Sequence, residues 1–278
     1  MLRIIKIELI KIFSKSRSYI GFVVSFIISL LVTFGIYLEG DTIIQIALDS
    51  ISDSFHFSGD IVNGNLSTFL LYNSFVIHIP ILVALVSGDL ISGESNSGTI
   101  RLMLVRPISR FNIYVSKWIA GLLYTLILVL FFVSTSYLLG YILLGNGDLI
   151  VIRNGISVLD KADLFWRFFL AALHTSFSMM VISSLSICIS SFTKNSVGPI
   201  VSSVAILIAL NIICTIGFSF LEPILPYMFN VHLPKWQNFF ELDINITKVI
   251  FSVFIQILYI VMFAAIGLLK FIKKDVLD

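Results

Sequence analysis

The sequence predicts an all-α integral membrane protein with six transmembrane helices, and three observations lead to this fold class. Hydrophobic residues make up 58% of the 278 residues and charged residues only 12%, about half the charged fraction of a soluble protein. The mean hydropathy is +1.04. Several apolar runs reach about 20 residues, the length that a helix needs to cross a bilayer. This composition excludes a soluble enzyme, a disordered chain and a small disulfide-stabilised domain, and a net charge of +2 gives no reason to expect a nucleic-acid partner.

The apolar runs define the expected spans. They are too long and too poorly alternating to be strands of a membrane barrel. The first run follows a basic segment, but it exceeds the apolar region of a signal peptide, so we interpret it as a retained helix. The six expected spans are Tyr19–Leu38, Thr68–Ser87, Trp118–Leu144, Phe165–Ser190, Val197–Leu221 and Val249–Leu269.

The distribution of charge predicts the orientation of these spans. With both termini in the cytoplasm, 13 of the 18 Lys and Arg residues lie inside and 11 of the 16 acidic residues lie outside. The inside then carries a net charge of +8 and the outside −6. The first external loop, Glu39 to Ser67, contains no Lys or Arg. Because basic residues are enriched in cytoplasmic loops, the sequence predicts that both termini are cytoplasmic.

The N-terminal segment, residues 1–17, is expected to form an interfacial helix on the inner leaflet. Its apolar residues fall within an arc of roughly 100° on a helical wheel; they are Leu2, Ile5, Leu9, Ile12 and Phe13. The alternative is that its basic residues serve only as an orientation signal.

Two external segments have different compositions. Residues 222–247 contain three prolines and five aromatic residues. Prolines end helices and aromatic residues favour the bilayer interface, so we expect short interfacial or re-entrant pieces there. The acidic loop of residues 40–67 carries either a short helix near Ile43–Ile51 or an ordinary solvated loop.

The chemistry missing from the spans restricts the function. The expected spans contain no Asp, Glu or Lys, whereas ion-coupled carriers need ionisable groups within the membrane. His78 and His174 are interpreted as interhelical hydrogen-bonding groups rather than proton relays, and Asn211 and Gln256 as polar contacts. The sequence has neither a phosphate-binding loop nor a nucleophile motif. The chain is therefore either passive or driven by another protein.

The cytoplasmic segment between the second and third spans, residues 88–110, carries the most specific pattern. We expect a polar turn, a short helix near Thr99–Val105, a break at Pro107, and a helix capped at its N-terminus by Ser109.

This segment resembles that of the type 2 ABC exporter permeases, which have E-x-x-x-G-T-[IL], then Leu, then P-[IV]-S-R, and a Lys entering the next helix. The matching residues are Glu94, Gly98, Thr99, Ile100, Leu104, Pro107, Ile108, Ser109, Arg110 and Lys117. In sequence the resemblance covers this window; in layout it covers the whole chain, taken as a single permease domain of residues 1–278.

The resemblance implies a compact exporter fold in which two permease chains, identical or different, assemble with two ATP-binding cassette subunits. The loop after the second span would act as a coupling helix that docks into the ATPase. ATP and Mg²⁺ would bind to that partner, and this chain would carry no cofactor. The residues assigned to coupling are Glu94, Gly98, Thr99, Arg101, Arg106, Pro107 and Arg110. The family also points to a substrate path that includes the second span, where the candidates are Tyr72, Asn73 and His78.

We therefore expect a non-enzymatic permease subunit in the bacterial cytoplasmic membrane that exports a hydrophobic or amphipathic substrate, such as a lipid, a peptide or a drug. The alternatives are an ion-coupled carrier or channel, and a membrane component that acts in mechanotransmission or immunity without transport.

Overall fold

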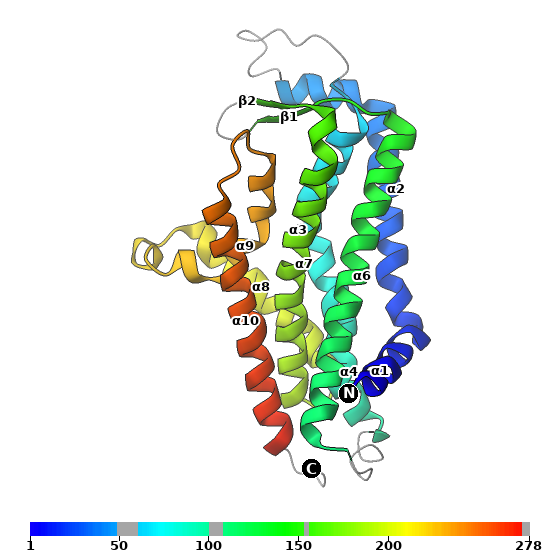
Figure 1. The fold of residues 1–278 in the computed structure, drawn as a ribbon, viewed down its shortest axis with the longest axis vertical. Coiled ribbons are helices and arrows are strands. Elements are labelled where there is room, and N and C mark those ends of the chain that lie inside the picture. The colour runs from blue at the N-terminus through cyan, green and yellow to red at the C-terminus, as the bar shows by residue number, and fades with distance from the viewer. Residues whose placement is uncertain (49–60, 100–107, 153–155, 274–278) are drawn as a thin grey trace.

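The computed structural model describes residues 1–48, 61–99, 108–152 and 156–273. Long helices run side by side along one direction, and α1 and the end of α10 lie at the same end of the molecule (Figure 1). Six helices in the described part are long and apolar enough to cross a membrane, which confirms the expected number of spans.

The helices are longer than the apolar runs. Their bounds are α2 Ser16–Leu48, α3 Gly64–Ser87, α6 Arg110–Leu144, α7 Lys161–Phe192, α8 Val197–Ile216 and α10 Ile246–Lys273. The extensions arise because polar end residues continue the helical hydrogen bonds beyond the apolar stretch. Helix α6 has the N-cap that the sequence predicted. The side chain of Ser109 accepts a hydrogen bond from the backbone N–H of Asn112.

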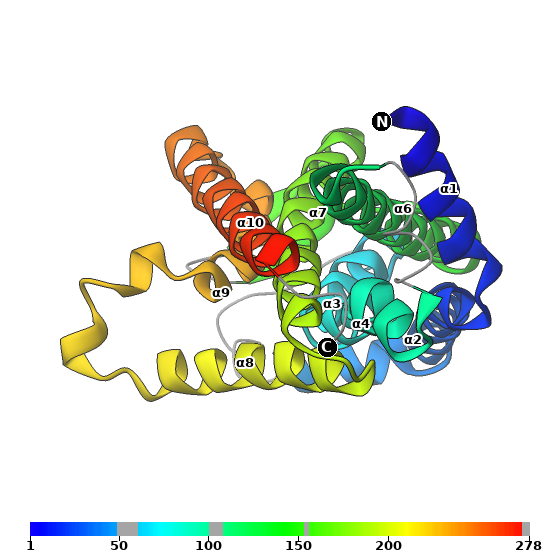
Figure 2. The same ribbon diagram turned by 90° about the horizontal axis from the view of Figure 1, so that it is seen from below.

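The fifth span is the exception, because it is shorter than expected. The sequence predicted a helix as far as Leu221, but α8 ends at Ile216. Gly217 follows with φ of 69°, a left-handed conformation that terminates helices and favours glycine. In Figure 2, α8 extends away from the other helices, and much of its surface is exposed.

Helix α7 forms the centre of the molecule and packs against α3, α6, α8 and α10 (Figures 1 and 2). Small side chains along its buried faces, many of them serines, let neighbouring helices approach closely. At the end far from α1, aromatic side chains from three elements form a buried cluster that includes Tyr72, Phe168, Trp236 and Phe240.

The segment before α10 consists of short pieces, as the prolines predicted. They are η1 Ser219–Leu221, η2 Leu225–Tyr227, α9 Phe229–His232 and η3 Leu233–Phe240. Trp236 of η3 is completely buried, so this segment packs against the helices rather than forming a separate domain.

Two features of the fold, a β-hairpin and a short helix, were not anticipated from the sequence. A hairpin of β1 Leu149–Ile152 and β2 Ile156–Leu159 connects α6 to α7, with Leu149 opposite Leu159. A second addition is α4, Asp89–Asn96, where we expected a polar turn. Its residues Leu90 and Ile91 are buried. Their packing stabilises the helix, whereas the polar composition of the segment does not indicate one.

Candidate functional site

The candidate site is the junction of α1 (Leu2–Ser14), α4 and α6 at the end of the molecule where the N-terminus lies. Glu8 lies on the buried face of α1, and Lys117 lies two turns into α6. The Lys117 side chain is fully buried and its Nζ lies 2.7 Å from Glu8 Oε2. The same Nζ lies 2.7 Å from Glu94 Oε2 of α4. One ammonium group thus joins three helices.

Lys11, one turn beyond Glu8, completes a ring of four charges. Its Nζ lies 2.8 Å from Glu8 Oε1 and 3.1 Å from Glu94 Oε1. We call Glu8, Lys11, Glu94 and Lys117 the ionic ring. Burial lowers the pKa of Lys11, but the two carboxylates more than offset this and raise it above its ordinary value of 10.5. Lysines and glutamates alternate around the ring, so its formal charges cancel.

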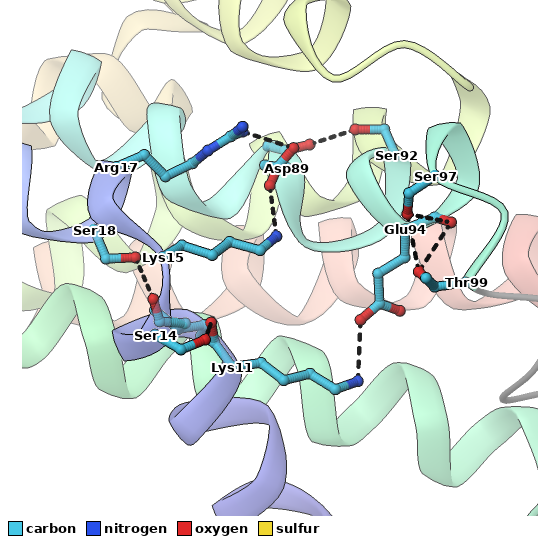
Figure 3. A network of polar contacts seen from close by, with 12 residues as sticks. Lys11, Ser14, Lys15, Arg17, Ser18, Asp89, Ser92, Glu94, Ser97 and Thr99 are labelled. Carbon is cyan, nitrogen blue, oxygen red and sulfur yellow. Dashed lines mark hydrogen bonds and ion pairs between the residues drawn. The ribbon is translucent and has the colours of Figure 1, made fainter.

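A second ion-pair cluster lies beside the ring (Figure 3). The buried carboxylate of Asp89 accepts from Lys15 Nζ at 2.9 Å and pairs with Arg17 Nη1 at 2.8 Å. Asp89 is in the first turn of α4, where a negative charge also interacts favourably with the helix dipole. These pairs attach α4 to the bend between α1 and α2.

An open groove of about 590 Å³ runs along the same junction. Its walls are apolar side chains of α1 and the segment before α6, together with the turn after α4. Two cations, Lys11 and Lys15, are exposed along it. The lining also includes Ile4, Ile7, Ser97, Thr99, Ile108 and the carboxylates of Glu8 and Glu94. A groove of this size, lined by apolar side chains and by charged side chains of both signs, suits a protein segment rather than a small polar ligand.

The residues assigned to coupling lie in different surroundings. Glu94 points inward to the ionic ring. Gly98 has φ of 71°, which makes glycine necessary for the turn. Thr99 Oγ1 closes this turn, 2.9 Å from Ser97 Oγ. Arg110 Nη1 donates to Ile272 O at 2.7 Å and thereby joins α6 to the end of α10.

The remaining coupling residues, Arg101, Arg106 and Pro107, lie outside the described residues. The same is true of nearly all of the short helix expected near Thr99–Val105.

The three substrate-path candidates make different contacts in the described structure. Tyr72 is fully buried and donates to Phe168 O at 3.1 Å. Asn73 Oδ1 accepts from Gln237 Nε2 at 2.7 Å on the exposed side. His78 Nδ1 lies 2.8 Å from Ser74 O of its own helix. All three side chains therefore form hydrogen bonds within the protein, two with other elements and one within the same helix.

Sequence reasoning missed most of the junction. It recorded Glu8, Lys11 and Asp89 only as members of a charge count, and Lys117 only as a residue that matches the family pattern, with no contact assigned to any of the four. One available indication was that the inner segments before the last span hold only three acids, each near an expected helix. Isolated acids in such basic surroundings are good candidates for structural ion pairs.

Six long apolar helices with a charged junction at one end define a polytopic membrane protein. The family model described as ABC-2 family transporter protein matches residues 2–276. The chain therefore belongs to the ABC-2 family of transporter membrane proteins.

A relative in Bacillus subtilis (strain 168) is the uncharacterized protein YhcI. It is 26% identical over 211 residues, which are 73% of this chain and 66% of that protein. The matched region thus spans slightly less than two thirds of the relative's length.

Proposed function

We propose that the chain is the permease subunit of an ATP-driven exporter for a hydrophobic or amphipathic substrate. A separate ATP-binding cassette subunit would bind ATP and Mg²⁺, and a second permease chain would complete the membrane part. The proposed location is the cytoplasmic membrane of a bacterium, with the junction of α1, α4 and α6 on the cytoplasmic side.

The observation that carries this proposal is the ionic ring. It connects α4, directly before the Gly98 turn, with α1 and with the long helix α6. A partner that pushes on this turn would therefore move α4 and α6 together. The groove beside it offers the ATPase an apolar wall with charged side chains of both signs along it, which suits a partner surface bearing apolar and polar side chains.

The rival functions require other features. An ion-coupled carrier needs ionisable groups that change state within the membrane. In the described residues, the buried carboxylates of α1 and α4 are held in ion pairs at one end of the molecule. A non-transporting component would need the same ATPase contact but no passage for a substrate.

Purification of the tagged full-length chain from its own host tests the proposal. We expect an ATP-binding cassette protein, identified by mass spectrometry, in a near-stoichiometric amount. Ile7→Arg together with Thr99→Arg should reduce this recovery, because both side chains line the groove. Leu2→Arg is the matched control, because Leu2 is highly exposed on the same helix and does not line the groove.

Equal ATPase recovery in all variants would exclude the groove as the docking surface. Reconstitution of the chain with the ATPase then separates the remaining functions. Substrate movement that requires ATP supports an exporter, movement that follows an ion gradient without ATP indicates a carrier, and ATP hydrolysis without movement indicates a non-transporting component.

A further inference from the structure

A second groove lies at the other side of the molecule, between α7, η3 and the first turns of α10. Its volume is about 500 Å³, within the range of ligand pockets. The lining is almost entirely apolar and includes Trp166, Leu173, Phe239, Val249 and Val253. The one strongly polar side chain in its wall is His174.

The donor and the acceptor of each hydrogen bond around His174 follow from its neighbours. His232 Nε2 lies 2.9 Å from Pro226 O, and a carbonyl oxygen only accepts, so this nitrogen carries the proton. Burial lowers the pKa of His232 to about 4, so at neutral pH its Nδ1 is unprotonated and accepts from Ser252 Oγ at 3.0 Å.

The hydroxyl of Ser252 has a single proton, which is thereby committed to His232. His174 Nε2, 3.0 Å from Ser252 Oγ, must therefore donate to it. This leaves His174 Nδ1 as a bare acceptor. That atom is buried and has no hydrogen-bond partner among the described residues, although the side chain borders the groove. An occupant that supplies an O–H or N–H donor would satisfy it.

Two cations lie on the elements that border the groove. Lys235 lies in η3 and Lys248 in the first turn of α10, and neither forms an ion pair with any described residue. Burial lowers the pKa of Lys235, and the charge of Lys248 lowers it further. Lys248 directly precedes the lining residue Val249, and Lys235 lies four residues before the lining residue Phe239. The unpaired cations and the unpaired acceptor thus belong to the same region.

The neighbouring cation, Arg167, already forms hydrogen bonds within the protein. Arg167 Nη1 donates to Phe239 O at 2.8 Å and to Glu241 O at 2.7 Å, which holds the loop after η3. It therefore shapes the groove, while Lys235 and Lys248 remain available to an anion.

We propose that this groove binds an anionic glycerophospholipid with a hydroxyl-bearing headgroup, whose acyl chain packs between α7 and α10 and whose phosphate lies near Lys235 and Lys248. An apolar wall, two unpaired cations and an unpaired acceptor are together complementary to this class of amphiphile. The binding site is independent of the proposed export function, because it does not depend on an ATPase or on movement of the lipid.

Native mass spectrometry of the purified full-length chain tests the binding. The probes are phosphatidylglycerol and phosphatidylcholine with identical acyl chains. We expect the wild-type chain to retain phosphatidylglycerol in preference, and the double variant Lys235→Gln/Lys248→Gln to lose roughly tenfold or more of this preference. Val253→Trp should reduce retention of either lipid, because the indole fills the apolar part of the groove.

Matched controls are Lys161→Gln, a cation at the start of α7, and Val201→Trp on the exposed face of α8. Both should behave like the wild-type chain. An unchanged preference in the double lysine variant, or full retention in Val253→Trp, would overturn the proposal.

Fluorescence quenching gives an answer that does not depend on folding of the Val253 variant. Phosphatidylglycerol with a brominated chain should quench Trp166, measured as the difference between the wild-type chain and Trp166→Phe. Stronger quenching by this lipid than by brominated phosphatidylcholine supports the site, whereas equal quenching by the two lipids contradicts it.

Discussion

At the scale of single residues, Lys117 is the most consequential charge in the described structure. A buried ammonium group is costly unless its partners compensate for the water that it loses. Lys117 has two carboxylate oxygens at 2.7 Å. The ring therefore specifies how the three helices meet more than it adds net stability.

Replacing Lys117 with Met should destabilise the protein by about 3 kcal/mol, because it leaves two buried carboxylates with one lysine. Thermal unfolding in detergent measures the change. Lys6→Met is the control, because Lys6 is an exposed lysine of α1. Adding Glu8→Gln to Lys117→Met should recover part of the loss, since Lys11 and Glu94 then remain a neutral pair. Equal stability of the two single lysine variants would show that the ring is unimportant.

His232 predicts a dependence of stability on pH. Burial lowers its pKa in the folded state to about 4, with a contribution from the charge of Lys235, from an ordinary value near 6.5. The unfolded chain therefore binds a proton first as the pH falls. The stabilisation is complete above about pH 6.5 and decreases as the pH falls toward 4.

The measurement is the melting temperature between pH 7.5 and 4.5. His232→Gln should flatten this part of the curve, because glutamine does not titrate. A wild-type curve that is no steeper than that of His232→Gln would contradict the assignment.

Helices are the scale at which the sequence was most informative. Length and hydrophobicity along a single segment determine whether it can cross a membrane, so all six spans could be predicted. The cap at Ser109 is equally local. Helix α4 was missed because its stability comes from packing of Leu90 and Ile91, which depends on neighbours that are distant in sequence.

The pairing of α3 with α6 predicts a contrast between two glycines. A Cβ placed on Gly64 would overlap the backbone of Gly140, whereas a Cβ on Gly35 would meet no atom within 4 Å. We expect Gly64→Ala to lower the melting temperature by forcing the helices apart. Gly35→Ala should be neutral or slightly stabilising, because alanine favours a helix by about 1 kcal/mol over glycine. Thermal unfolding of both variants measures this, and a similar change in both would refute the close approach.

At the scale of the whole molecule, the sequence predicts orientation through its charges, and this is open to a direct test. Single cysteines at Ser97 and Lys161 probe exposed positions at opposite ends of the described structure. The background is Cys188→Ala/Cys214→Ala. A membrane-impermeant maleimide should label position 161 in intact cells and position 97 only after permeabilisation. The reverse pattern would invert the predicted topology.

The sequence could not predict how the ends of the molecule are assembled. Glu8 and Lys117 are separated by more than a hundred residues, and their contact depends on the bend that returns α1 toward α6. The residues that line the groove between α7, η3 and α10 also come from three segments with different local structure. Such sites depend on tertiary packing, which periodicity and composition do not encode.

Ser190 joins α7 to the break between α3 and α4. Its hydroxyl donates to Gly88 O at 2.6 Å and accepts from the N–H of Ser92 at 2.8 Å, so it bridges the break between α3 and α4. Ser190 belongs to α7. The opposite end of this helix carries Trp166, which lines the groove between α7, η3 and α10. A displacement of α4 that preserves this bridge shifts α7 along with it. Helix α7 is therefore a continuous structural connection between the charged junction and the distant groove.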